Sequence, residues 1–583
     1  MAPSIGPALR DAHMPMMSPT VDKRTLYLSG LGIGLGMAAA LIAQLLTRSI
    51  YFVTNLAFFH RISLQPAAPH EAHLGWWIIF LPAIGGIIVG LMARYGSKAI
   101  RGHGIPEAME QVLTNESRIP PRITFLKPLS AAIAIGTGGP FGAEGPIIAT
   151  GGALGSLIGQ LLPVSASERK TLLAAGAAAG MAATFGSPVS AVLLAVELLL
   201  FEFRPRSFIP VALAASAATA MRFALVGTAP AFVIPELANV PGPAVAGYLV
   251  EGLIFGVIAA VVTRAVYAIE DGFEKLPIHW MWWPALGGLV VGACGLIAPR
   301  TLGVGYDNIE NLLAGSWTPS FIAMLCLFKF ISWSISLGSG TSGGTLAPLF
   351  TIGGALGALF GAAVALVLPK LGVEPRVAAL VGMAAIFAGA SRALLASVVF
   401  AFETTRQPMG LLPLLAGCTA AFMVTSMIQR HSIMTEKIAR RGVRVIGEYA
   451  ADVLARMNAK AVATSNVLTL KAGDTVLQAR EWLGTHSAHQ AFPVVDEHNH
   501  VVGVLTRRDL AKELPDTSVT LKSIIVRQPV VVFDNESLRD AADRMAREKV
   551  GRLPVLSGAT GKLVGIVTRS DLVHARGMHA DAG

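Results

Sequence analysis

The chain contains 583 residues with a formal net charge of +10, but only 14% of its residues are charged and 53% are hydrophobic. A soluble globular protein carries about one quarter charged residues, so this composition argues against a soluble fold and indicates a membrane protein. The basic residues flank apolar segments instead of alternating with aromatic residues on a polar face, so we expect no nucleic-acid partner. Three cysteines stand singly in apolar stretches, without the spacing of a metal site or disulfide pair: Cys294, Cys326 and Cys418.

The N-terminal region is polar up to the first apolar stretch and lacks a small-residue cleavage site, so we expect no cleaved signal peptide. Leu26 to Leu46 is long enough to span a bilayer. Lys23 and Arg24 precede this span, and further basic residues follow the last one, as is typical of cytoplasmic segments. We therefore expect a multi-pass protein of the plasma membrane, or of the inner membrane in a bacterium, with both termini cytoplasmic.

Many apolar segments between Leu26 and Met427 are short and are interrupted by glycine clusters. A helix broken inside lipid is costly unless its free backbone groups face protein or a water-filled cavity, so this pattern indicates a transport site.

Three of these interruptions have the sequence pattern that is typical of a helix start. In each, glycine allows a tight turn and proline follows in the first helical turn, where its missing N–H removes no intrahelical bond. Several helix N-termini that converge would bind an anion through amides and helix dipoles, without a full cation that would hold it too tightly. The three turns are Gly102–Pro106, Gly142–Pro146 and Gly344–Pro348.

An internal repeat joins the two halves of the apolar region. Pro146 is followed by Gly151-Gly152-Ala153-Leu154-Gly155, and Pro348 by the same five residue types at the same spacing, with the two prolines 202 positions apart. Gly180-Met181-Ala182-Ala183 recurs at this offset as well. Close packing of small residues explains the composition but not the shared register. We therefore predict two related halves, about 26–225 and 245–430, with a binding site between them near the bilayer midplane.

A smaller repeat lies in the polar tail. Residues 501–510 and 563–572 share a β-branched run followed by Thr-Arg and an Asp-Leu pair, and a short strand with proline near its start precedes each. This pattern predicts a soluble α/β region.

The three turns resemble the anion-lining signatures of the CLC chloride channel and transporter family, and the tail resembles tandem CBS domains. The resemblance covers nearly the whole chain. It implies an all-α polytopic membrane domain built from two inverted repeats of broken helices, plus a C-terminal α/β CBS pair, in a homodimer with one pore per subunit. The expected domains are a cytoplasmic segment (1–24), a membrane domain (25–430), a basic linker (431–446) and CBS domains at 447–514 and 515–583.

Glu144 is an isolated acid between glycines at the head of an apolar helix, where an ionisable group is usually functional. A plain N-terminal acid favoured by the helix dipole is the alternative. The resemblance implies a gating glutamate, which competes with chloride for amide donors and swings away when protonated. It also implies the anion-lining residues Gly102, His103, Gly104, Ile105, Gly142, Ala143, Gly145, Thr345, Leu346, Ala347 and Met434.

Several positions depart from the family pattern and leave anion selectivity open. His103 stands where the family usually has Ser, Ala143 where it often has Arg, and Leu346 where it often has Phe. The His103 imidazole either donates to the anion or packs beside it. Met434 aligns with a pore-lining Tyr. Lys127 resembles a buried lysine that favours anions electrostatically, and snorkelling to an interface is its alternative.

Leu198 stands where the family's exchangers typically carry a second glutamate, next to the position of Glu197. Because leucine carries no proton, we predict gated, passive chloride conduction, with chloride/proton exchange as the alternative. Glu202 lies near the same helix end, and water could substitute for the missing acid.

The tail residues Thr506, Asp509, Thr568 and Asp571 have the spacing of capping boxes. The resemblance to CBS domains implies that they bind an adenine nucleotide (ATP, ADP or AMP), while helix capping alone is the alternative. We expect no required cofactor. A CBS-regulated divalent-cation transporter is a remote alternative, since acidic rings are missing. We expect no enzyme, because no nucleophile or metallohydrolase motif occurs.

Overall fold

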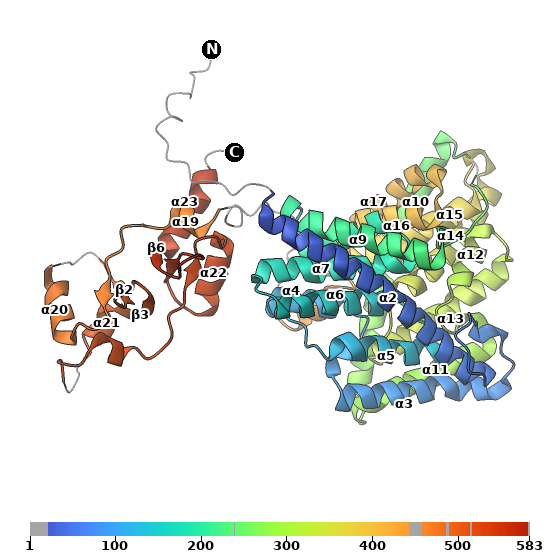
Figure 1. The fold of residues 1–583 in the computed structure, drawn as a ribbon. Helices are drawn as coiled ribbons and strands as arrows, with labels where there is room; N and C mark the ends of the chain where they lie inside the picture. The colour runs from blue at the N-terminus through green and yellow to red at the C-terminus, as the bar shows by residue number, and fades with distance from the viewer. Residues whose placement is uncertain are drawn as a thin grey trace, which may run out of the picture. The chain divides into compact units, whose positions relative to one another are not determined.

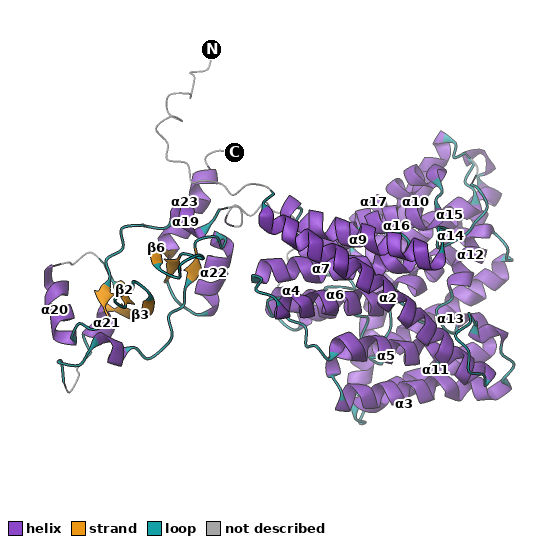
Figure 2. Ribbon diagram, in the orientation of Figure 1, coloured by secondary structure: helices purple, strands orange, loops and turns teal. Residues whose placement is uncertain are grey.

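The computed structural model describes residues 21–237, 239–443, 454, 457–485, 489–512 and 516–580. The chain divides into two compact units, one from Val21 to Tyr449 and one that contains the C-terminal region from Ala450 onward. The first is helical and the second contains the strands (Figures 1 and 2). We describe each unit by itself.

The helical unit consists of two halves with the same order of elements (Figure 1). In each half a long helix leads, a helical hairpin with small residues lies in the middle, and a broken helix precedes the last span. The first half comprises α2 (Lys23–Phe59), α3 (Phe80–Tyr95), α4 (Ile105–Thr114), α5 (Ile123–Gly136), α6 (Glu144–Leu161), α7 (Ala166–Phe185), α8 (Pro188–Ala195) with a π-helical turn η4 (Val196–Leu200), and α9 (Pro205–Val226). The second half comprises α10 (Gly242–Glu274), α11 (Trp283–Ile297), α12 (Tyr306–Ala314), α13 (Pro319–Gly338), α14 (Leu346–Val367), α15 (Pro375–Ser391), α16 (Leu394–Thr405) and α17 (Leu411–Ile428).

Residues 202 positions apart make reciprocal contacts, as a two-fold axis between the halves requires. A Cβ atom added to Gly86 in α3 would lie 2.3 Å from the carbonyl oxygen of Pro284, and one added to Gly288 in α11 would lie 2.4 Å from that of Pro82. The backbones of α3 and α11 therefore touch directly, which small residues permit. The predicted repeat is thus a structural repeat.

Within the described residues, eight helices are long and apolar enough to cross a membrane. The other apolar helices are shorter, which confirms the expectation of broken spans. The eight segments are Lys23–Phe59, Gly75–Tyr95, Pro205–Val226, Gly242–Glu274, Trp280–Ile297, Pro319–Gly338, Leu346–Val367 and Pro408–Ile428.

The C-terminal unit contains two three-stranded sheets with the same topology. In each, the first strand pairs in parallel with the second and the second pairs antiparallel with the third. Met457 and Ala459 lie in the core of the second sheet, so the start of this region packs with its end. The elements are α19 (Ala459–Val462), β1 (Leu470–Lys471), α20 (Val476–Thr485), β2 (Ala491–Val495), β3 (Val501–Thr506), α21 (Arg507–Leu510), β4 (Val532–Phe533), α22 (Leu538–Arg547), β5 (Arg552–Leu556), β6 (Leu563–Thr568) and α23 (Arg569–Ala580).

The predicted fold class is confirmed: a helical membrane domain of two repeats precedes an α/β pair. Part of the expected linker 431–446 forms a short helix, α18 (Glu436–Arg440), and residues 444–446 lie outside the described residues, as do the first twenty residues.

The close crossing of α3 and α11 gives a test of the fold. Gly288→Leu would force a side chain into the backbone of α3, and overpacking of this kind costs about 1–3 kcal/mol. We expect a lower melting temperature in detergent, measured by loss of monodisperse protein on heating. Gly30→Leu in α2 is the matched control, because an added Cβ there meets nothing within 4 Å. Equal melting of the two variants would contradict the crossing.

Candidate functional site

Two of the predicted turns are joined by a backbone bridge. The Gly142 N–H donates to the Gly344 carbonyl at 3.3 Å, and the Gly344 N–H donates to the Gly142 carbonyl at 3.0 Å. Because these glycines are 202 positions apart, the bridge lies on the axis that relates the halves. The third turn joins through Gly102, whose carbonyl accepts from the Gly343 N–H at 3.4 Å. The three turns that the sequence singles out therefore meet.

The helices that start at these turns point free amides at one region. The first intrahelical bond of α6 runs from Ile147 to Ala143, and that of α14 from Leu349 to Thr345. The amides before these donors have no intrahelical acceptor, and the helix dipoles add partial positive charge. The predicted lining residues Ala143, Gly145, Thr345 and Ala347 are all buried here.

The Glu144 side chain lies directly over the bridge. It is 1% exposed, and its Oε2 atom would lie 1.6 Å from a Cβ added to Gly142 and 3.0 Å from one added to Gly344. Oε1 accepts a hydrogen bond from the Tyr306 hydroxyl at 3.0 Å, whereas Oε2 has no partner among the described residues. A carboxylate thus occupies the region toward which free helix amides point, which is the geometry of a group that competes with an anion.

Two buried lysines hold the turns of the two halves in equivalent ways. The Lys127 ammonium donates to the carbonyls of Ile100 at 2.8 Å and Gly102 at 2.7 Å. The Lys329 ammonium donates to those of Thr301 at 3.0 Å and Gly303 at 3.3 Å. Both side chains are buried inside protein, so the Lys127 amine does not lie at a lipid interface. Sequence reasoning missed the role of Lys329, although it lies 202 positions after Lys127.

The turn before α4 is held by charges from α18. Glu107 accepts from the Gly104 N–H at 2.8 Å and from the Lys437 ammonium at 2.9 Å. His103 is 5% exposed, and its Nδ1 atom is buried without a partner among the described residues. An imidazole nitrogen at a helix start can donate to an anion, so this geometry is compatible with the donor role and leaves the packing role equally open.

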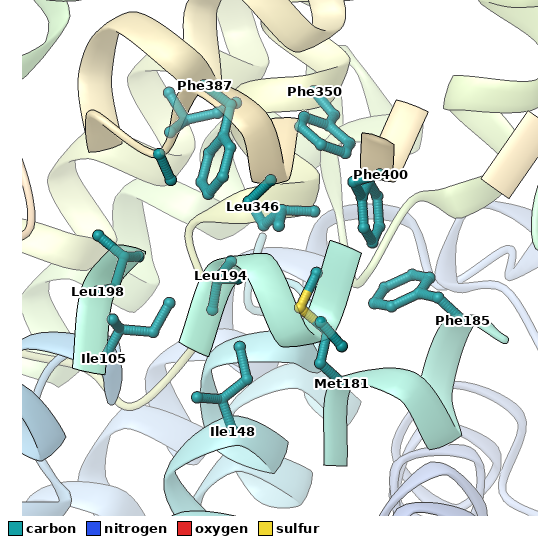
Figure 3. Packing of buried hydrophobic residues seen from close by; sticks show 14 of the residues in the cluster. Ile105, Ile148, Met181, Phe185, Leu194, Leu198, Leu346, Phe350, Phe387 and Phe400 are labelled. Carbon is teal, nitrogen blue, oxygen red and sulfur yellow. The ribbon is translucent and has the colours of Figure 1, made fainter. Parts of the chain in front are cut away.

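Apolar side chains surround the helix ends. Figure 3 shows Ile105, Leu198 and Leu346 among the buried side chains of this region, each at most 3% exposed. α4 packs against the π-helical turn η4 that carries Leu198. Such surroundings exclude water and strengthen electrostatic interactions at the amides.

Two acids near Leu198 are already engaged. The Glu197 carboxylate accepts from the amides of Leu395 and Ala396 at the start of α16, at 3.0 Å each. Glu202 accepts from the Ser207 hydroxyl at 2.5 Å and lies in a cluster with basic side chains. Both acids are therefore held by other groups of the protein.

Met434 is fully buried in the turn before α18. Its amide donates to the Ser432 hydroxyl at 3.2 Å, and the Ile433 amide before it donates to the Ala390 carbonyl at 2.8 Å. The α15 helix end and α18 thus fix this residue. Its predicted contact with an anion stays a prediction.

The predicted tail residues form two equivalent capping boxes. The Thr506 hydroxyl donates to Asp509 at 2.6 Å, and the Thr568 hydroxyl donates to Asp571 at 2.8 Å. Each threonine ends a strand and begins the helix that follows. The Thr506 hydroxyl and the Lys512 ammonium hold the pKa of Asp509 below its ordinary value. Helix capping is therefore present, and nucleotide binding stays a prediction.

In the part of the chain that the structure describes, no cluster of three or more His, Cys, Asp or Glu side chains could hold a metal ion. The three cysteines are buried and free.

Comparison with known sequences matches this arrangement. The profile of the voltage gated chloride channel family covers residues 84–426, and that of the CBS domain covers 459–516 and 521–577. A putative chloride channel protein, ClcB-like, of Ralstonia nicotianae is 28% identical over 63% of this chain and 87% of its own length. The H(+)/Cl(-) exchange transporter ClcA of Salmonella arizonae is 28% identical over 74% of this chain and 92% of its own length.

A solved structure extends the comparison to both units. The crystal structure of a eukaryotic CLC transporter matches with a TM-score of 0.62 and 21% identity, over 94% of this chain and 98% of that chain. At this identity the match shows a shared fold.

The contact between Gly142 and the carboxylate gives a test of the site. Gly142→Ala places a methyl group where Glu144 Oε2 lies, so the carboxylate must move although its charge remains. We expect faster uptake of radioactive chloride into proteoliposomes. The uptake rises about tenfold if the hydrogen bond from the Tyr306 hydroxyl to the displaced carboxylate contributes ~1.4 kcal/mol. Gly354→Ala is the control, since its added Cβ meets only ordinary contacts beyond 3.4 Å. Unchanged uptake in Gly142→Ala would mean that the carboxylate does not obstruct the anion.

Proposed function

The chain belongs to the voltage-gated chloride channel family, and on this premise we propose that it exchanges chloride for protons across a membrane, with Glu144 as the group that both gates chloride and carries the proton. The observation that carries the proposal is the Glu144 carboxylate, buried over the bridge between the halves among free helix amides. A relative that is 28% identical bears the name of an H(+)/Cl(-) exchange transporter, which supports exchange over passive conduction.

The proposed cycle uses one group for two tasks. While ionised, Glu144 occupies the amides of the α6 and α14 starts and excludes chloride. When protonated, its charge no longer competes, so chloride takes the amides and the neutral carboxyl carries a proton outward. Lys127 and Lys329 add positive charge on the two sides without facing a carboxylate in an ion pair among the described residues. Such fixed donors and charges favour an anion in a region of low dielectric constant.

The inner half of the proton route is where Leu198 matters. Because a leucine carries no proton, we propose that ordered water conducts protons past it from the side of the Glu202 cluster. This route is the feature that separates exchange from passive conduction, which the sequence alone favoured.

Proton movement in Glu144→Gln tests the proposal. Purified protein in liposomes is given a chloride gradient without a pH gradient, and external pH is followed. We expect uphill proton movement at a fixed ratio to chloride in the natural protein. In Glu144→Gln we expect chloride flux without protons and without dependence on pH, since the amide cannot titrate.

Chloride flux without proton movement in the natural protein would establish passive conduction instead. Unaltered flux and pH response in Glu144→Gln would contradict the gating role altogether. Glu403→Gln is a suitable control. Glu403 accepts hydrogen bonds from the amides of Val189 and Ser190 at the start of α8, and it takes no part in the proposed cycle.

We also propose that the protein is a homodimer of two independent pores. Glu403 of α16 caps the start of α8, and Glu197 of η4 caps the start of α16. Both helix starts leave large apolar side chains exposed, among them Val189 at 55% and Leu395 at 49%. A second copy would cover this face. We further propose cytoplasmic termini in a plasma or inner membrane, supported by the basic residues that flank the first and last spans.

For the C-terminal unit we propose binding of an adenine nucleotide, with Asp509 and Asp571 toward the ribose. Titration of the full-length protein with ATP, ADP and AMP up to about millimolar concentration tests this by heat release. We expect Asp509→Asn and Asp571→Asn to weaken binding. Asp540→Asn is the matched control, because Ser537 and Asp540 form the same capping box on α22 although Ser537 is not the last residue of a strand. If no nucleotide releases heat, nucleotide binding is wrong, and the C-terminal unit has a structural or assembly role instead.

A further inference from the structure

The hydrogen bond between Tyr306 and Glu144 has no counterpart in the other half. Tyr306 begins α12 and Ile105 begins α4, each directly after a left-handed glycine, Gly305 or Gly104. The phenol reaches the carboxylate at 3.0 Å, whereas the isoleucine can make no hydrogen bond. Among the described residues, the Glu144 carboxylate therefore has a side-chain hydrogen-bond partner from the second half only.

From this asymmetry we propose that Tyr306 is a positioning residue, whose hydroxyl latches the Glu144 carboxylate over the amides and so sets how readily the gate opens. The proposal rests on the proposed function, in which Glu144 must leave its place in each cycle. It adds a residue that sets the pace of that step.

The Tyr306 ring is held firmly enough to act as a latch. It packs edge-on against Phe185 with ring centroids 5.7 Å apart and against Phe232 at 6.1 Å. Phe185 in turn packs edge-on against Phe400 with ring centroids 4.9 Å apart, and Figure 3 shows these two rings next to each other. A ring fixed by aromatic neighbours directs its hydroxyl with little loss of rotamer entropy.

Lys329 fixes the backbone that presents the tyrosine. Its ammonium donates to the carbonyls of Thr301 and Gly303, immediately before the turn at Gly305. A Cβ added to Gly305 would lie 3.5 Å from the same nitrogen, so the lysine lies under the turn. One buried cation therefore holds the latch loop in place.

The chemistry of the bond gives its expected effect. A phenol O–H that donates to a carboxylate stabilises the ionised form more than the protonated form. Among the described residues, Lys329 of α13 acts electrostatically on Glu144 and Tyr51 of α2 acts on Tyr306, while Asp307 of α12 acts on Lys329. None of them changes in a phenylalanine substitution, so the hydroxyl alone is tested.

Tyr306→Phe tests the latch with the proton and chloride assay described above. We expect faster chloride turnover and a rise of about one unit in the pH of half-maximal flux, the tenfold change expected when one hydrogen bond to a charged group is lost. The ratio of protons to chloride should stay that of the natural protein, because Glu144 is present. Tyr248→Phe is the control, since it removes another buried hydroxyl, one that accepts from the Glu374 amide at 3.1 Å.

A second variant gives the opposite sign. Replacement of Tyr306 by 3-fluorotyrosine keeps the ring shape and makes the hydroxyl a stronger donor, so half-maximal flux should move to lower pH. Should Tyr306→Phe fail to fold, this variant alone decides: a shift to lower pH supports the latch, and no shift overturns it.

The double variant Tyr306→Phe with Glu144→Gln separates the latch from a structural effect. We expect no further change in this background, because the carboxylate that the phenol holds is gone. An equal acceleration in both backgrounds, or a natural pH profile in Tyr306→Phe, would overturn the proposal. If the natural protein conducts chloride passively, exchange fails as a function, while the pH profile of chloride flux still tests the latch.

Discussion

Two backbone hydrogen bonds between Gly142 and Gly344 set the positions of the two helix ends that matter most. They fix the starts of α6 and α14 against each other, so the free amides of both first turns face one region. A side chain at either glycine would intrude on the Glu144 carboxylate. The site therefore depends on a contact that only unsubstituted backbone can make, and this explains why glycines stand at both positions.

The buried lysines explain how the turns keep a fixed conformation without regular secondary structure. A lone ammonium inside a membrane protein costs several kcal/mol to bury unless it is paired or hydrogen-bonded. Here Lys127 and Lys329 each bind two carbonyls of a turn, which satisfies the ammonium and the turn together. Because the partners are carbonyl dipoles and not carboxylates, the positive charge is not cancelled and continues to favour an anion nearby.

Much of this arrangement could be predicted from the sequence, for physical reasons. The constant offset between Pro146 and Pro348 predicts two related halves. Glycine and proline mark the helix starts, because few other residues permit the tight turn and the first helical position. Tyr306 and Lys329 could not be recognised in the same way, because tyrosine and lysine occur in many structural roles and neither residue type marks a particular backbone conformation. The offset itself held a usable signal for Lys329, which repeats Lys127, but not for Tyr306, which lies 201 positions after Ile105 and so falls one residue out of register. What the offset could not reveal is that the phenol reaches across to the carboxylate, because that contact joins different halves.

The scaffold is symmetric, and its proposed chemistry lies where the symmetry fails. Glu144 repeats as Leu346, and Tyr306 begins α12 where Ile105 begins α4, while the glycine bridge and the lysines are kept. A fully symmetric pair of glutamates over the bridge would place two carboxylates in one buried region, where they could not both ionise. One acid on one side gives a direction: the phenol that holds the carboxylate comes from the second half, whereas the first half has the apolar Ile105 at the equivalent helix start. Inverted repeats thus supply a binding site shared by both sides, and a few substitutions in one repeat make the two sides of the membrane unequal.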